Sequence, residues 1–206
     1  YRSSTSEYSH NKLINQLNGV EQDAFLNQLA TFRLLTKNLE EVTEETKINF
    51  VSSDAFEEPR PENYDVVLMN PPYLRNDNQV VPIKQEKKTH MLESIEEIKG
   101  EESWVRKANQ PNLYFYFVDW SRHYLRSEGK SGLILYRKFV KNQDAQYVRE
   151  FLKDDLIAIV TYPRGFFDEF RTTTCIALTE KDSDRDTAKF IRISDKKLLE
   201  EPDKIR

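Results

Sequence analysis

Cysteine and histidine are scarce in this chain, and each shortage excludes a class of site. Among the 206 residues Cys175 is the single cysteine, so no disulfide can form within the chain. The lone thiol fits a reducing cytoplasm, and the first residues show no signal-peptide pattern. His10, His90 and His123 lie far apart and share no ligand spacing with Cys175. We therefore expect no zinc or other metal site.

Long apolar runs and a strongly basic balance are also missing. No run reaches the length that spans a membrane, so no membrane partner is expected. The formal net charge is −4, and 32% of the residues are charged. A surface of this overall sign does not indicate nucleic-acid binding, which would need a local basic patch or a further domain.

What is present is a short apolar run that ends on a stiff polar turn. Val66–Met69, β-branched at its start, has the pattern of a buried strand in a parallel sheet. It is followed by Asn70, Pro71, Pro72 and Tyr73. Neither proline can donate a backbone hydrogen bond, so the strand must end here. The turn therefore lies at a strand's carboxyl end, where open α/β sheets bind their ligands.

The turn brings together groups that suit a planar amine. Asn70 offers a side-chain carbonyl, the Pro-Pro turn leaves a backbone carbonyl nearby, and Tyr73 offers a flat aromatic face. Two acceptors and a platform fit the exocyclic amine of adenine or a carboxamide nitrogen. Asn-Pro-Pro alone also fits an ordinary proline turn, but the strand before it and the aromatic after it favour a site.

Two upstream strands end in acids in the same way. Residues 17–20 are followed by Glu21, and the alternating residues 47–53 are followed by Asp54. Three strands with polar ends predict a doubly wound, mostly parallel α/β sheet with one ligand edge. Taken alone, Glu21 also fits an acid at the start of the helix expected over residues 24–35.

Downstream, residues 74–111 are a polar insertion with a helix from Glu86 to Lys99 that ends at Gly100. The insertion fits a substrate-contacting lid or a solvated excursion equally well. The next helix begins after Pro111, is apolar nearly all round, and runs to Arg126. Further elements are expected as strands at 130–136, 156–162 and 173–178, the last two an antiparallel hairpin, a helix at 144–152 and a weak strand at 190–193.

The helix after Pro111 also carries Asp119, Ser121 and His123, the residue types of a hydrolase triad. They lie too close together on one helix to form one, so a hydrolase is excluded.

These residues and their order resemble the amino-group DNA methyltransferases that modify adenine at N6 in restriction-modification and phage-defence systems. Residues 70–73 resemble their catalytic motif, and the likeness extends from about Gly19 to Lys181. The other matching positions are Glu21, Asp54, Asn112-Leu113-Tyr114, Gly129, Leu133 and the aromatic loop before Thr172. The resemblance implies a Rossmann-like catalytic domain over residues 1–181, with residues 182–206 a charged tail or a linker to a further domain.

For the cofactor, the resemblance implies S-adenosylmethionine at the carboxyl edge of the sheet. Glu21 would hold its ribose, Asp54 its adenine amino group, and Phe117 would pack against its adenine ring.

For the substrate, the resemblance implies an adenine turned out of double-stranded DNA, because its amine cannot be reached inside the stack. Asn70 and the Pro71 carbonyl would hold the amine, and Tyr73 and Phe167 would sandwich the ring. Phe166 or Phe170 could replace Phe167. From the residues alone, these loop aromatics fit base stacking, a partner contact or a plug at the sheet edge.

The chain departs from the family pattern in one respect. The glycine-rich loop that cradles the methionine end of the cofactor should precede Glu21 by roughly one helix, yet no glycine lies before Gly19. With five glycines in all, the loop and the central first strand are expected to be missing, as in an N-terminally truncated fragment. Such a fragment should bind the cofactor poorly and could be inactive. A DNA-specificity subunit or a fused recognition or nuclease domain is an expected partner.

Two other functions remain open at this point. The glutamine methyltransferases of translation release factors use the same motif on a carboxamide. The long insertion and the aromatic loop favour DNA, because a peptide glutamine needs no stacking platform. A non-catalytic scaffold or interaction domain is the third possibility, supported by the missing loop.

Overall fold

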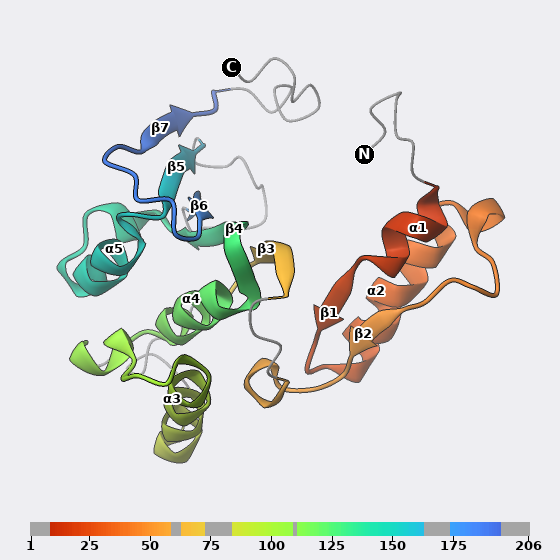
Figure 1. Ribbon diagram of the computed structural model, residues 1–206, viewed down its shortest axis with the longest axis horizontal. Helices are drawn as coiled ribbons and strands as arrows, with labels where there is room; N and C mark the ends of the chain where they lie inside the picture. Colours follow the sequence, from red (N-terminus) through yellow and green to blue (C-terminus); the bar gives the residue numbers. More distant parts are fainter. Residues whose placement is uncertain (1–8, 59–62, 73–83, 109–110, 163–173, 195–206) are drawn as a thin grey trace. The chain divides into compact units, whose positions relative to one another are not determined.

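The computed structural model describes residues 9–58, 63–72, 84–108, 111–162 and 174–194. The chain forms two compact units, residues 1–59 and residues 60–206 (Figure 1).

The first unit is a two-stranded parallel sheet with two helices. Its elements in chain order are α1 (His10–Asn15), β1 (Asn18–Val20), α2 (Ala24–Thr36), the 3₁₀ turn η1 (Leu39–Glu41), β2 (Asn49–Val51) and the 3₁₀ turn η2 (Ala55–Glu57). Val20 pairs with Val51, and the Glu21 N–H donates to the Val51 carbonyl at 3.1 Å. Both predicted upstream strands are therefore confirmed, and their carboxyl ends lie at the same edge.

Helix α2 confirms the expected helical spacing, but most of its large apolar side chains are exposed. The Asp23 side chain accepts from the Phe25 and Leu26 N–H groups at 2.9 and 3.0 Å and so fixes the helix start. Phe25 is 70% exposed and Phe32 62% exposed. α2 packs on β2, with Leu34 and Leu35 half-buried, but the larger part of the apolar face that the sequence predicted stays exposed in the described residues.

The second unit is built on a five-stranded mixed sheet with the order β3-β4-β6-β5-β7. The strands are β3 (Tyr64–Met69), β4 (Leu125–Tyr136), β5 (Leu156–Thr161), β6 (Thr174–Glu180) and β7 (Lys189–Arg192). β3 pairs with β4 and β7 with β5 in parallel, whereas β6 lies antiparallel to β4 and β5. The predicted antiparallel hairpin and the weak last strand are confirmed.

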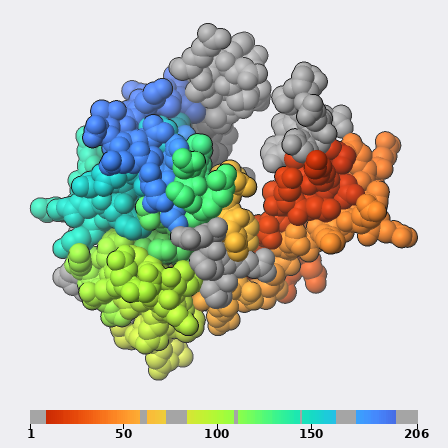
Figure 2. Space-filling view, in the orientation of Figure 1, coloured from red at the N-terminus to blue at the C-terminus, as the bar shows by residue number. Residues whose placement is uncertain are grey.

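Helices cover one side of this sheet. They are α3 (Gln85–Lys99), the 3₁₀ turn η3 (Trp104–Lys107), α4 (Leu113–Tyr124), the 3₁₀ turns η4 (Arg137–Val140) and η5 (Gln143–Ala145), and α5 (Gln146–Leu152). α4 packs on β3 and β4, and α3 packs on α4 (Figure 1). In the visible face of this unit, α3 occupies one end and β7 the other (Figure 2). α3 ends at Gly100 as predicted, with the left-handed φ of 68° that favours glycine.

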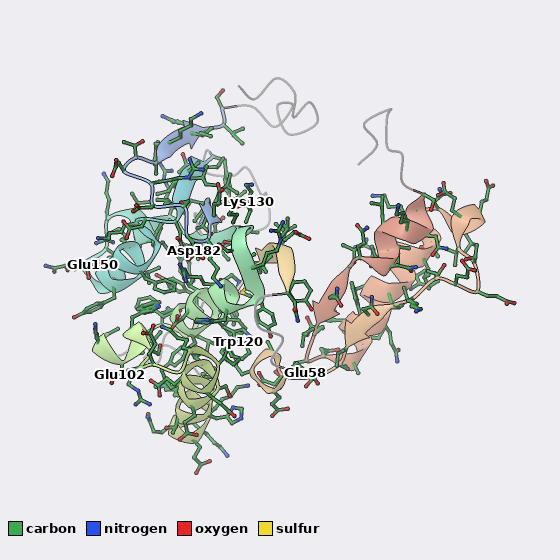
Figure 3. The ribbon with its side chains drawn as sticks, in the orientation of Figure 1. Glu58, Glu102, Trp120, Lys130, Glu150 and Asp182 are labelled. Carbon is green, nitrogen blue, oxygen red and sulfur yellow. The ribbon has the colours of Figure 1, made fainter. Side chains whose placement is uncertain are left out.

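The core lies between α4 and the sheet. On β4, Leu133 and Leu135 are buried, and they pair with the buried Ala177 and Cys175 of β6. Trp120 of α4 is 1% exposed, and its ring meets the Tyr124 ring edge-on (Figure 3). The alternation along β4 and β6 is the period of two that predicted these strands.

One boundary differs from the expectation. α4 ends at Tyr124 rather than at Arg126, and β4 begins at Leu125 rather than at Lys130. Leu125 is 1% exposed and pairs with Tyr64, and its carbonyl accepts from the buried Lys181 Nζ at 2.8 Å. These long-range contacts draw the chain out of the helix. The α/β fold class is otherwise as expected, with three parallel and two antiparallel strand pairs.

Candidate active site

The proline turn follows β3 where the sequence places it. Met69, the last residue of β3, pairs with Leu133, and the strand stops before Asn70. Asn70 and Pro72 are exposed, whereas Pro71 is buried. The buried ring anchors the turn and leaves the Asn70 carboxamide at the surface of the sheet edge. Tyr73 lies outside the described residues.

The aromatic loop of residues 163–173 begins and ends at the same edge. β4 runs parallel to β3, and its last residue Tyr136 pairs with Thr174, the first residue of β6. The hydroxyl groups of Tyr162 and Thr174 form a hydrogen bond that joins the two ends of the loop. Phe166, Phe167 and Phe170 lie outside the described residues, so their contacts with a base stay a prediction.

The two acids of the first unit share one edge of the β1–β2 sheet. Glu21 is exposed, and its Oε1 accepts from the Asp23 N–H at 2.9 Å, which leaves Oε2 without a hydrogen bond in the described part of the chain. Asp54 is half-buried, and its Oδ1 accepts from the Phe56 N–H at 3.1 Å. Asp54 is the N-cap residue of η2. Glu21 instead binds the N–H of Asp23, which is itself the N-cap residue of α2.

These residues fit S-adenosylmethionine in part. Within the described residues, Oε2 of Glu21 accepts no hydrogen bond, and it lies at a strand end, which is where a ribose hydroxyl would bind. No glycine-rich turn accompanies it, since Gly19 is the one glycine before it in the sequence. Phe117 is half-buried on α4 in the other unit. The cofactor roles of Glu21, Asp54 and Phe117 therefore stay predictions.

α4 carries a buried charge cluster that sequence reasoning missed. Asp119 is 0% exposed, and its Oδ2 accepts from the Ser103 hydroxyl at 2.5 Å. Its Oδ1 lies 3.6 Å from Lys99 Nζ and 3.6 Å from His123 Nε2. The Ser121 hydroxyl instead donates to the Val118 carbonyl at 2.8 Å. Asp119 thus joins α3, η3 and α4, and the three residue types that suggested a hydrolase form no triad.

A second ion pair fixes η3 to α3. Arg106 donates two bonds of 2.6 Å to the two oxygens of Glu96, and the Ser103 N–H donates to Glu96 Oε1 at 2.9 Å. The hydrogen bond from Arg106 lowers the pKa of Glu96 from 4.5 to about 2. Burial raises the pKa of the Cys175 thiol to about 12, which suits its place in the core and makes it a poor nucleophile.

The described residues contain no group of three or more histidine, cysteine or acidic side chains arranged to hold a metal ion. None of the helices described is both long and apolar enough to cross a bilayer.

The family model of the Eco57I restriction-modification methylases matches residues 4–167, which include the strand, the proline turn and both upstream acids. The chain belongs to this family. The match also covers α4 and most of the sheet of the second unit. The matched range also contains Glu21, Asp54, residues 70–73, residues 112–114, Gly129 and Leu133, the positions that resemble the amino-group methyltransferases.

Individual relatives agree with this membership. The chain is 26% identical over 220 residues to the type II restriction enzyme and methyltransferase RM.Eco57I of Escherichia coli, covering 90% of this chain and 21% of that protein. The type IIG restriction endonuclease BpuSI has a TM-score of 0.70 at 19% identity, over 84% of this chain and 20% of that one. The methyltransferase subunit of a type I system from Streptococcus thermophilus has a TM-score of 0.59 at 19% identity, over 85% of this chain and 35% of that one.

These likenesses show a Rossmann-like methyltransferase fold. The chain spans about a fifth of the length of the curated relative that it matches.

Proposed function

We propose that this chain supplies the catalytic turn of an S-adenosylmethionine-dependent methyltransferase that acts on the N6 amine of adenine in DNA, within a restriction-modification or related defence system. The observation that carries the proposal is the Asn70–Pro72 turn at the carboxyl end of β3, with Asn70 exposed and Pro71 buried. Membership of the restriction-modification methylase family supports it.

The turn acts on the amine through two acceptors. The Asn70 side-chain carbonyl and the Pro71 carbonyl accept the two amine hydrogens, which favours a pyramidal nitrogen whose lone pair is free to attack. Both acceptors also stabilise the positive charge that develops on nitrogen, and a fixed turn does so without reorganising. The bound S-adenosylmethionine supplies an electrophilic methyl group on its sulfonium.

The adenine must leave the duplex to reach the turn. Unstacking costs a few kcal/mol, and stacking on an aromatic side chain returns about 1–3 kcal/mol per base. Tyr73 follows the turn directly, and Phe167 lies in the loop whose ends meet at the same sheet edge. We assign these two rings to the two faces of the base.

Two of the remaining cofactor contacts belong to the first unit. We assign Glu21 to the ribose, because its Oε2 has no hydrogen bond in the described part of the chain, and Asp54 to the cofactor's adenine amino group. Phe117 would pack on the adenine ring.

Methyl transfer from labelled S-adenosylmethionine by the full-length protein tests the proposal. Unmethylated double-stranded DNA and a glutamine-containing protein substrate are offered in parallel. The proposal predicts label on DNA that digests to N6-methyladenine. Label on protein glutamine would instead support the release-factor type of enzyme, and transfer to neither would support a scaffold.

A further inference from the structure

Four exposed cations lie at the carboxyl edge of the second unit's sheet, the edge at which Asn70 follows β3. Arg137 and Lys138 directly follow β4, which pairs with β3, and Lys141 directly follows the turn η4. Arg192 is the last residue of β7, at the other side of the sheet. β3, β4, β5 and β7 all run in the same direction, so their ends meet at one edge. Within the described part of the chain, none of these four cations forms an ion pair.

The acids of this sheet lie at the opposite edge. There Arg122 binds Asp155 at 2.6 Å and Asp182 at 2.8 Å, and Glu180 ends β6. At the carboxyl edge, the residues that directly follow the strand ends, 70–72, 137–143, 162 and 193–194, contain no acid, and the first acid after Lys141 is Asp144 of η5. The neighbouring segments 73–83, 163–173 and 195–206 each carry equal numbers of basic and acidic residues. A chain of net charge −4 therefore presents a basic patch beside Asn70.

The basic residues after β4 stand on a fixed turn. Phe139 is 1% exposed and anchors the turn in the core. Arg149 of α5 donates from Nη1 to the Phe139 carbonyl at 2.6 Å and to the Asn142 carbonyl at 2.7 Å. The Lys141 N–H donates to the Lys138 carbonyl at 3.0 Å. The backbone is thus set before any ligand arrives, which lowers the entropy lost on binding.

We propose that Arg137, Lys138 and Lys141 bind the phosphate backbone of DNA beside the extruded adenine. This proposal rests on the proposed function. An adenine held at Asn70 stays joined to its strand, so the neighbouring phosphates must pass along the same edge. Lysine and arginine contacts to phosphates position a duplex without reading its sequence. The patch therefore sets affinity and register, and base recognition belongs to other parts of the protein.

The test measures DNA binding by the full-length protein against salt. A fluorescent duplex of mixed sequence is titrated at several KCl concentrations, and log Kobs is plotted against log[KCl]. For the triple variant Arg137→Gln, Lys138→Gln, Lys141→Gln, we expect a slope shallower by about 2–3, at roughly 0.9 per lost phosphate contact. Binding should weaken to a similar degree on duplexes of different sequence.

A matched control removes the same charge elsewhere on the unit. Lys130, labelled in Figure 3, Lys153 and Lys189 are exposed and lie away from the carboxyl edge. The triple variant Lys130→Gln, Lys153→Gln, Lys189→Gln should keep the wild-type slope. An unchanged slope in the first variant, or an equal loss in both, would overturn the proposal.

Methyl transfer by the wild-type protein separates this failure from a failure of the proposed function. If the wild type methylates adenine in DNA while the first variant keeps the wild-type slope, only the phosphate assignment is wrong. If the wild type transfers no methyl group to DNA, the proposed function fails, and this inference fails with it.

Discussion

Removing the Asp119 carboxylate should destabilise the second unit more than removing any exposed acid. Asp119 is fully buried, and the side chain of its partner Lys99 is 9% exposed with its Nζ at 3.6 Å. Asp119→Ala removes the buried counter-charge of that ammonium, leaving the 73% exposed Glu101 at 3.5 Å as its acid partner, and also removes the 2.5 Å bond from Ser103. Breaking a buried pair on one side costs about 3–5 kcal/mol.

Urea unfolding followed by tryptophan fluorescence measures this cost. Trp104 and Trp120 are the two tryptophans of the chain, and they lie on η3 and α4, the elements that the cluster joins. At an m-value of about 2 kcal/mol/M, the loss lowers the urea midpoint by roughly 2 M. The double variant Lys99→Met, Asp119→Asn should lose less free energy of unfolding than the two single variants lose together, because no unpaired buried charge remains in it.

The exposed pair between Arg126 and Asp65 is the control. Arg126 Nε and Asp65 Oδ1 are 2.5 Å apart, closer than Lys99 and Asp119 at 3.6 Å, but the two side chains are 55% and 75% exposed. Asp65→Asn should therefore cost less than about 1 kcal/mol. Equal losses for Asp119→Ala and Asp65→Asn would refute the assignment of Asp119 as a buried tie between α3, η3 and α4.

Three further predictions concern the same unit. Glu96→Gln should cost of order 1 kcal/mol at neutral pH, since Arg106 is 40% exposed and solvent screens the pair. This contribution is complete above pH 4.5 and is lost as the pH falls toward 2, so urea midpoints of variant and wild type should converge in acid. The Cys175 thiol, with its pKa raised to about 12 by burial, should resist a thiol reagent at pH 8 until urea unfolds the chain, and rapid labelling of the native chain would contradict this. Gly129→Ala should lower the free energy of unfolding by about 1–3 kcal/mol, seen as a lower melting temperature, because the added Cβ would lie 2.8 Å from the Arg126 carbonyl oxygen. Gly132→Ala is the control and should cost less, because its Cβ meets the exposed side chain of Leu68, which can move aside.

The strands were predictable because their signals are local. The end of β3 is marked by the prolines that follow Asn70, and α3 ends at a glycine that adopts a left-handed φ. Asn70 could be placed at a strand end for the same reason. The prediction that β3 is buried was wrong, because β3 is an edge strand of the described sheet on which Val66 and Leu68 are 57% and 80% exposed. The apolar spacing of α2 also predicted its helix, although most of its apolar side chains are exposed.

Features set by distant contacts could not be predicted. The start of β4 depends on Tyr64 and Lys181, which are far from Leu125 in the sequence. Lys99, Ser103 and Asp119 meet across three elements, and no periodicity marks the three together. The basic patch at Arg137 and Lys138 could not be predicted either, because it depends on the pairing of β6 with β4, which brings the strand ends to one edge.

The most direct test of the central claim is the methyl transfer rate of the Asn70→Ala variant of the full-length protein on DNA. Asn63→Ala is the matched control, since Asn63 is exposed at the other end of β3. If the Asn70 carbonyl stabilises charge on the amine, kcat should fall by about 10²-fold or more while binding of S-adenosylmethionine is retained. The control should keep the wild-type rate. An Asn70→Ala variant that methylates adenine as fast as the wild type would show that the proline turn is not the catalytic site.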